Sequence, residues 1–330
     1  ILDDAFMREG EPERVAQLLS QPPLNLPVKI LNVRERFLDE MRELREAEEK
    51  RKVFRETFYK VLSETAQRER CRFLVQGTIL ADIVETVGGV KTQHNVLSQV
   101  GINPRERFGF IVVEPLKTLL KARVRQPFPG PGLSVRVVGE IRRDKLESLK
   151  KATAIAEAKL SEYSPDQYFA AILDNKEKTH DATLVKVQHT VTQLFNLHPS
   201  RVSVSIFEDK ATGIKEGERC YGEIAALNVQ TIDGHIYELS IKGLVALQAK
   251  IVEDNPSLTR IFYVVQETSQ RQQYAVAIRA VETQDFLTAK VADIPWVTLK
   301  EIARDILSAC PNVSSVFYDV TPKPVSYTHL

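Results

Sequence analysis

Short apolar runs alternate with amphipathic stretches over the first 125 residues of the chain. The expected strands end at Asp3, Val33, Val75 and Val113. The expected helices cover residues 12–19, 34–70 (as one helix or a pair), 79–86 and 119–124. This alternation is typical of an α/β protein with a doubly wound parallel sheet.

The pattern changes in the second half, where longer strands and fewer helices are expected. Further strands are predicted over Leu133–Gly139, around Val204, and over Ile261–Val265, Tyr274–Val281 and Val313–Val320, with helices over Leu146–Tyr163 and Leu299–Ala309. A hairpin is expected over Asn228–Ile241 around Asp233-Gly234. The charged, glycine-containing stretch Glu208–Glu223 predicts an exposed loop, with a partner or substrate contact as the alternative. Together these features indicate an α+β domain with a largely antiparallel sheet.

The composition of the chain argues against several classes of function. The chain has 45 basic and 44 acidic residues, a net charge of +1, which gives no support to a general nucleic-acid or membrane-surface role. The three cysteines are odd in number and far apart, so a disulfide framework is not expected. This use of cysteine is typical of a protein in the reducing cytoplasm. No apolar run reaches the length of a membrane span.

The segment Gln126–Leu133 stands out because three prolines and two glycines make it stiff and irregular. Four cations, Lys121, Arg123, Arg125 and Arg136, flank it. A rigid loop with cations at both ends suits an anionic ligand such as a nucleotide phosphate. The alternative is a proline-rich linker with ordinary surface charge.

Three acidic residues and one histidine are further candidates. Asp3 lies at the carboxyl end of a strand, where open α/β sheets place ligands. Asp82 and Glu85 lie one helical turn apart and could hold Mg²⁺ through water, or be surface charges. His94 lies in a polar loop and is a structural residue or part of a site.

In their order along the chain, several motifs resemble the synthetase part of the GMP synthetase family. They are the segments 3–8, 76–79 with Asp82 and Glu85, 91–96, 113–117 with Lys121, 127–133 leading into 136–140, 279–283 with Asp285, and 316–320 with Lys323-Pro324. The resemblance covers most of the chain. The proline loop is its most specific part, and it makes the linker interpretation the weaker one.

The resemblance implies an amide-forming ligase of the adenine nucleotide α-hydrolase-like, N-type ATP pyrophosphatase fold. In that family XMP attacks the α-phosphate of Mg·ATP, and ammonia then displaces AMP to give GMP. For ATP the resemblance implies Asp3, Gln76, Gly77, Thr78 and Lys121, with Lys121, Asp82 and Glu85 as catalytic residues and Asp82 and Glu85 as ligands of Mg²⁺. For XMP it implies Lys91, His94, Asn95, Arg125, Pro127, Phe128, Pro129, Gly130, Pro131, Gly132 and Lys323.

The resemblance also implies a domain plan. Residues 1–125 would form the ATP pyrophosphatase domain and residues 126–330 a homodimerisation domain with an insertion at about 164–256. The family's phosphate loop would precede Asp3, so a chain beginning at Ile1 is expected to be inactive. Ammonia would come from a separate glutaminase subunit or a fused domain.

Three features depart from the family pattern. The spacer between Lys121 and the proline loop is short, the segment 164–256 matches poorly, and the tail Val325–Leu330 looks foreign. Two other functions are therefore kept open: a non-catalytic dimerisation or binding module, and a related ATP pyrophosphatase acting on tRNA. The neutral net charge weighs against the tRNA alternative.

Overall fold

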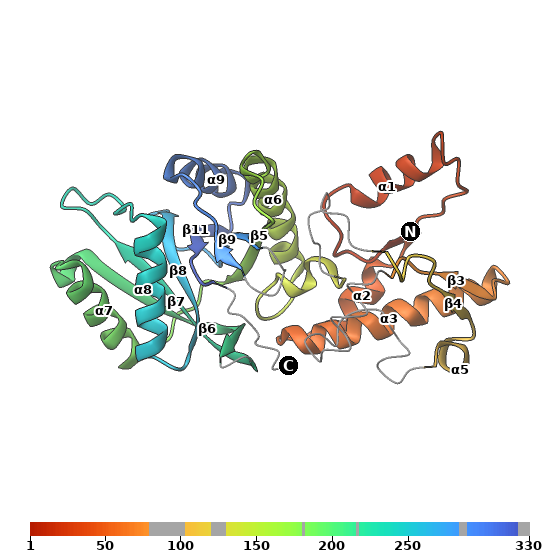
Figure 1. Ribbon diagram of the computed structural model, residues 1–330, viewed down its shortest axis with the longest axis horizontal. Coiled ribbons are helices and arrows are strands. Elements are labelled where there is room, and N and C mark those ends of the chain that lie inside the picture. Colours follow the sequence, from red (N-terminus) through yellow and green to blue (C-terminus); the bar gives the residue numbers. More distant parts are fainter. Residues whose placement is uncertain (79–102, 120–129, 180–181, 216–217, 284–288, 323–330) are drawn as a thin grey trace.

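The computed structural model describes residues 1–78, 103–119, 130–179, 182–215, 218–283 and 289–322. Two parts lie side by side, an N-terminal part with small sheets and a C-terminal part built on one large sheet (Figure 1). The segment that follows the proline loop, yellow in Figure 1, lies between them. The chain is therefore a mixed α/β protein.

The N-terminal part contains two parallel two-stranded ladders. The strands β1 (Leu2–Asp3) and β2 (Leu31–Asn32) form one, and β3 (Phe73–Val75) and β4 (Ile111–Val113) form the other. Within the described residues its helices are α1 (Glu11–Ser20), α2 (Arg34–Glu40), α3 (Ala47–Arg68) and α5 (Pro104–Phe108), and the helices predicted over 79–86 and 119–124 lie outside those residues or at their edge. The four predicted strands are thus confirmed, and their pairing is parallel. Among the described residues the two ladders do not pair with each other.

Helix α3 joins these ladders through aromatic side chains. Phe54 packs with the buried Phe37 and Phe6 beside β1, whereas Tyr59 stacks on Phe108 beneath β4. Phe58 contacts both Phe54 and Tyr59 and so links the two clusters. The large apolar residues of this glycine-free helix therefore fix the position of both strand ends.

The C-terminal part is a seven-stranded sheet in the order β10-β9-β11-β8-β7-β6, with β5 also paired to β9. The strands are β5 (Gln167–Asp174), β6 (Val202–Lys215), β7 (Glu218–Val229), β8 (Leu258–Glu267), β9 (Tyr274–Glu282), β10 (Lys290–Val291) and β11 (Val313–Asp319). The pairs β9·β11 and β7·β8 are parallel and the other four pairings are antiparallel. The sheet is mixed, so the expectation of a largely antiparallel sheet is only partly met.

Helices cover one face of this sheet. They are α6 (Arg143–Leu160), α7 (Ala182–Phe195), α8 (Ile241–Asp254) and α9 (Trp296–Ala309), and their buried residues share one core with the sheet. The opposite face carries a second apolar cluster that includes Phe207, Phe262 and Phe317. Alternation along each strand sends successive side chains into these two clusters.

The prediction of a loop over Glu208–Glu223 was wrong for the described residues 208–215 and 218–223, because they belong to the long strands β6 and β7, which pair antiparallel. Two of the glycines that suggested a loop, Gly213 and Gly222, are instead required by packing against β8. A Cβ on Gly222 would lie 2.5 Å from Cγ2 of Thr259, and one on Gly213 would lie 2.8 Å from its Cβ. The segment 164–256 contributes β5, β6 and β7 to the same sheet as β8 and β9.

The predicted strand over Leu133–Gly139 was also wrong. Residues Gly132–Val135 form a short 3₁₀ helix, and only Val137 makes a β-bridge, to Ile172. Gly132 has a φ of 59°, which reverses the chain and prevents an extended start. The turn at Gly234 is present, but its hairpin amounts to a single bridge between Gln230 and Ile236.

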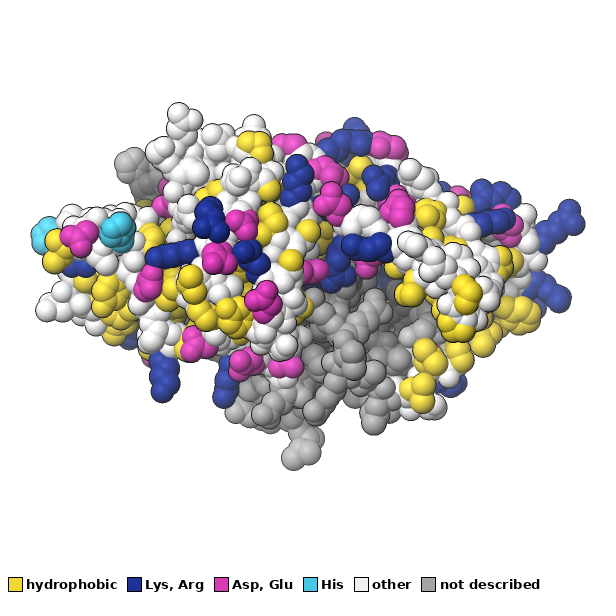
Figure 2. Space-filling model, turned by 90° about the horizontal axis from the view of Figure 1, so that it is seen from above, with side chains coloured by type: hydrophobic (Ala, Val, Ile, Leu, Met, Phe, Trp, Pro, Cys, Tyr) yellow, Lys and Arg dark blue, Asp and Glu magenta, His cyan; other side chains and the backbone are white. Residues whose placement is uncertain are grey.

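The surface agrees with the balanced composition. Figure 2 shows Lys and Arg side chains interspersed with Asp and Glu over the described part of the face in view. In the described ranges no helix combines the length and the apolar character that a membrane span needs.

Candidate functional site

Seven of the predicted site residues lie in the described part of the chain. They are Asp3, Gln76, Gly77, Thr78, Gly130, Pro131 and Gly132. The other predicted residues lie outside the described residues: Asp82, Glu85, Lys91, His94, Asn95, Lys121, Arg125, Pro127, Phe128, Pro129 and Lys323.

The carboxyl end of β1 holds two buried carboxylates side by side. Asp3 accepts a hydrogen bond from Nε of Arg34 at 2.7 Å, which compensates its charge. Asp4 accepts from the backbone N–H of Phe6 at 2.8 Å. Burial raises the pKa of Asp4 to about 6, because desolvation penalises the carboxylate and the neighbouring Asp3 adds repulsion. An aspartate paired with an arginine and a carboxyl group with a raised pKa thus meet at this strand end.

The end of the proline loop docks on the same turn. The N–H of Leu133 donates to the carbonyl of Phe6 at 2.8 Å, and Ser134 Oγ donates to the carbonyl of Pro131 at 2.6 Å. A Cβ on Gly132 would lie only 2.4 Å from the Phe6 oxygen. The predicted XMP residue Gly132 therefore lies against Phe6, three residues after the predicted ATP residue Asp3.

A pocket of about 210 Å³ opens beside this junction. Its charged lining residues are Asp3, Arg8, Glu9, Arg34, Glu147 and Lys150. Lys150 is 7% exposed and forms an ion pair with Glu147 at 3.1 Å. Such a lining offers donors to a phosphate and acceptors to hydroxyl or base N–H groups.

Sequence reasoning missed Arg8, Arg34 and Lys150 as pocket residues. Arg8 belongs to the opening motif 3–8, so that motif already contained part of the signal. Lys150 lies in the middle of α6, and from the sequence alone it looks like an ordinary solvent-exposed lysine of a helix. Only the packing of α6 against the β1 turn reveals that Lys150 is buried at the pocket.

Arg136, predicted as one of the cations flanking the loop, is buried among other side chains. It is buried over the ring of Phe169, with 4.4 Å between its guanidinium carbon and the ring centroid, and it lies 3.7 Å from Glu157. The same Glu157 accepts from Nε of Arg8 at 2.7 Å. Glu157 therefore ties the pocket residue Arg8 to the segment that follows the loop.

The ends of β3 and β4 form a second polar cluster. Gln76 Nε2 donates to Thr78 Oγ1 at 3.0 Å, and Thr78 Oγ1 donates to Glu114 Oε1 at 2.7 Å. The hydroxyl of Tyr59 donates to Oε1 of Gln76 at 3.1 Å. A Cβ on Gly77 would meet no atom of the described residues within 4 Å. The predicted ATP residues Gln76 and Thr78 thus lie together at a carboxyl strand end.

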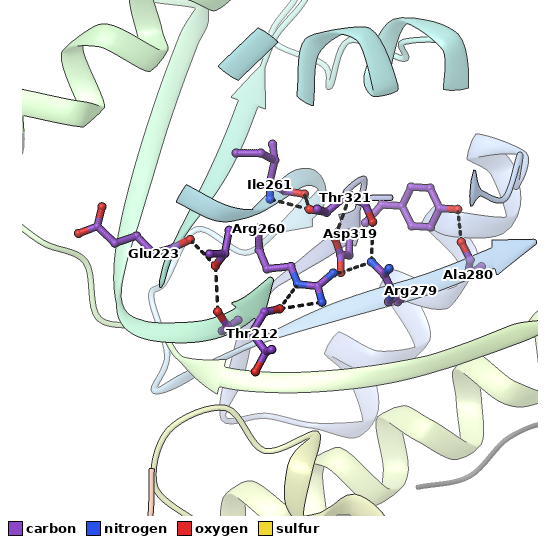
Figure 3. A network of polar contacts seen from close by, with 11 residues as sticks. Thr212, Glu223, Arg260, Ile261, Arg279, Ala280, Asp319 and Thr321 are labelled. Carbon is purple, nitrogen blue, oxygen red and sulfur yellow. Dashed lines mark hydrogen bonds and ion pairs between the residues drawn. The ribbon is translucent and has the colours of Figure 1, made fainter. Parts of the chain in front are cut away.

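A buried ionic network fixes the chain as it leaves β11 toward residue 323 (Figure 3). Nη1 of Arg279 donates to Oδ2 of Asp319 at 2.7 Å and to the carbonyl of Thr321 at 2.8 Å. Arg260 adds a contact to the same carboxylate at 3.3 Å. Burial alone would raise the pKa of Asp319, but the two arginines outweigh it and lower the pKa.

No group of three or more His, Cys, Asp or Glu side chains with metal-binding geometry is found within the described ranges. Asp3 is already paired with Arg34, and Asp4 favours the protonated form at a higher pH than usual. These two carboxylates by themselves are a poor fit for Mg²⁺, which prefers charged oxygen ligands.

These features define a class: an α/β protein with a polar pocket at the carboxyl end of a parallel strand, as in many ligand-binding α/β enzymes. The family model of the GMP synthase C-terminal domain matches residues 264–328. The chain is 37% identical to a subunit of the glutamine-hydrolysing GMP synthase of Sulfurisphaera tokodaii, over 98% of this chain and 84% of that protein. The corresponding subunits of Methanopyrus kandleri and Methanosarcina acetivorans are 31% and 30% identical, with 98% of this chain covered and 81% and 80% of those proteins.

The chain belongs to this family of glutamine-hydrolysing GMP synthase subunits, which are ligases. The resemblance drawn from the sequence motifs is thereby confirmed. These relatives do not favour the two alternatives, a non-catalytic dimerisation or binding module and an ATP pyrophosphatase acting on tRNA.

Proposed function

We propose that this protein aminates XMP to GMP with ATP and ammonia. An oxygen of the XMP base attacks the α-phosphorus of Mg·ATP and forms an O–P bond. The bond between the α-phosphorus and the oxygen that bridges it to the β-phosphorus breaks, and pyrophosphate leaves. Ammonia then displaces AMP from adenyl-XMP and gives GMP. The single observation that carries this proposal is the relationship to the GMP synthase subunits along 98% of the chain.

The described geometry supports the proposal in one respect. The motif 3–8 and the end of the proline loop, far apart in sequence, meet at Phe6 and Gly132 beside the charged pocket. Two nucleotides must be held next to each other for this reaction, since alignment of the attacking oxygen accounts for much of the rate. We assign one nucleotide anion to Arg8 and Lys150 in this pocket.

The remaining assignments complete the proposal. Asp3, Gln76, Gly77, Thr78 and Lys121 would bind ATP, and Asp82 and Glu85 would bind its Mg²⁺. Lys121 would neutralise charge that develops on the phosphates. Residues 91–95, Arg125, the loop 127–132 and Lys323 would bind XMP.

We also infer the assembly. Residues 1–125 would be an N-type ATP pyrophosphatase domain of the adenine nucleotide α-hydrolase-like fold, and residues 126–330 a domain that forms the homodimer. Ammonia would come from a separate glutaminase subunit, because each relative is one subunit of a glutamine-hydrolysing enzyme.

The test uses the protein expressed from its complete gene. With XMP, Mg·ATP and ammonium chloride we expect GMP, AMP and pyrophosphate in equal amounts, measured by chromatography of the nucleotides and a coupled pyrophosphate assay. Formation of AMP and pyrophosphate without GMP, or no dependence on XMP, would refute the proposal.

A further inference from the structure

Two buried lysines from different parts of the chain hold three consecutive carbonyl groups. Lys50, in the first turn of α3, donates from Nζ to the carbonyl of Val137 at 2.6 Å and to that of Gly139 at 2.5 Å. Lys145, near the start of α6, donates to the intervening carbonyl of Val138 at 2.6 Å. Both side chains are almost completely buried, at 1% and 0% exposure.

The carboxylates in this cluster are closer to Lys145 than to Lys50. Lys145 Nζ lies 2.6 Å from Oδ1 of Asp174 and 3.8 Å from Oδ2 of Asp209. Arg142 also pairs with Asp174, so Lys145 and Arg142 share this carboxylate. Lys50 instead directs its ammonium group at backbone carbonyls. A buried ammonium group in such surroundings costs free energy, so its contribution is the geometry that it imposes.

The three carbonyls belong to the segment that anchors the proline loop. Four residues before Val137, the N–H of Leu133 binds the carbonyl of Phe6. On the other side, the N–H of Val138 binds the carbonyl of Ile172 in β5. Gly139 is held against Asp209 so closely that a Cβ there would lie 2.3 Å from Oδ1. The loop thus ends in a segment fixed by α3, α6, β5 and β6 together.

We propose that Lys50 is a positioning residue that holds the described end of the proline loop, residues 130–133, at the β1 turn by fixing the backbone of residues 137–139 to α3. This inference rests on the proposed function, because it takes the loop to contact XMP. Lys50 itself lies inside the protein and does not contact substrate. Without its ammonium group the carbonyls of Val137 and Gly139 lose this donor, and the segment that follows the loop loses its hydrogen bonds to α3.

The experiment compares Lys50→Met with Lys52→Met in the complete enzyme. Lys52 is an exposed residue of the same helix, so the pair separates loss of the buried contacts from loss of a helix lysine. For Lys50→Met we expect kcat/KM for XMP to fall about 10-fold to 100-fold, mainly through a higher KM, because small displacements of a binding loop have effects of this size. The kcat at saturating XMP should change much less, and Lys52→Met should behave as the wild type.

Hydrogen exchange provides a readout that does not depend on activity. In Lys50→Met the amides of Leu133 and Val138 should exchange faster, whereas the amides of β8 and β9 should keep their protection. Should Lys50→Met fail to fold, Lys50→Gln, which keeps an amide donor, is measured in the same way and should show the same changes to a smaller extent.

The outcomes separate the two proposals. A wild-type enzyme that makes no GMP from XMP refutes the proposed function. An active wild type together with a folded Lys50 variant of unchanged KM for XMP and unchanged exchange refutes the positioning role. Equal losses of kcat and of apparent affinity for both nucleotides would also refute it, since they indicate general destabilisation.

Discussion

The α-carbon of Gly132 faces the carbonyl oxygen of Phe6 at a distance that leaves no room for a side chain. A Cβ built on Gly132 would lie 2.4 Å from that oxygen and 2.9 Å from its carbon. The φ of Gly132, +59°, is also one that other residues rarely adopt. This contact joins the proline loop to the strand end that carries Asp3.

Replacement of Gly132 by Ala should therefore separate the loop from the β1 turn. We expect a loss of about 2–4 kcal/mol in the free energy of unfolding, from backbone strain and steric overlap. Urea denaturation followed by circular dichroism measures it. Gly130→Ala is the control, because a Cβ at Gly130 would meet nothing within 4 Å. Equal stability of the two variants would contradict the close contact.

Lys150 tests the pocket. Lys150→Met should weaken binding of XMP or ATP about 10-fold or more, since a hydrogen bond to a charged group contributes about 1.5–3 kcal/mol. Isothermal titration with each nucleotide identifies which one occupies the pocket. The neighbouring Lys151 is exposed, and Lys151→Met should bind both nucleotides as the wild type does. Unchanged binding of both by Lys150→Met would remove this pocket from the proposed site.

Asp4 should reduce stability at neutral pH. Its pKa rises from 3.8 to about 6 on folding, so the folded state binds more protons than the unfolded state between these values. Stability therefore falls as the pH rises through this window, and the cost remains above it. Asn at position 4 keeps an oxygen that can accept from Phe6, and Asp4→Asn should be more stable near pH 7.5 by about 1–2 kcal/mol.

Urea denaturation at several pH values tests Asp4. The advantage of Asp4→Asn should disappear below about pH 4, where the carboxyl group of the wild type is protonated in both states. Asp3→Asn is the control, because it loses the ion pair with Arg34 and should not gain stability. A less stable Asp4→Asn at neutral pH would show that the charged carboxylate is favourable in its site.

The contribution of Lys50 to stability should change with pH in the direction opposite to that of Asp4. Desolvation, followed by repulsion from Lys145, lowers its pKa to about 7, whereas Asp209 and Asp174 act in the other direction. Between about 7 and the ordinary 10.5 the unfolded state binds more protons, so stability rises with pH. Relative to Lys50→Met, the wild type should gain at most about 1.4 kcal/mol per pH unit in this window. Denaturation of both proteins between about pH 6 and pH 9 measures the difference, and parallel curves would contradict it.

Arg279 should be essential for the end of β11. Arg279→Met would leave Arg260 as the cation next to the buried Asp319 and would remove the Arg279 donor from the carbonyl of Thr321. We expect the free energy of unfolding to fall by about 3–5 kcal/mol. The exposed Arg304, paired with its neighbour Asp305, is the control and should have little effect. Thermal unfolding compares the two variants. A similar midpoint for both would mean that Asp319 is stabilised without Arg279.

The sequence by itself determined the family and most elements of the N-terminal part. Strands ending at Asp3, Val33, Val75 and Val113 could be predicted because short apolar runs between polar segments have few other stable arrangements. The motif 3–8 and the proline loop carried the resemblance that the relatives confirm. Such patterns are local, so they can be read from the chain without its fold.

Tertiary structure alone decided the rest. The glycines of 208–223 favour a loop in isolation, but Thr259 of β8 approaches Gly213 and Gly222 and makes them strand positions. Lys50, Lys145 and Lys150 resemble solvated helix lysines, and their burial depends on which elements pack against α3 and α6. Long-range contacts set the environment of each charge, and no local pattern contains that information.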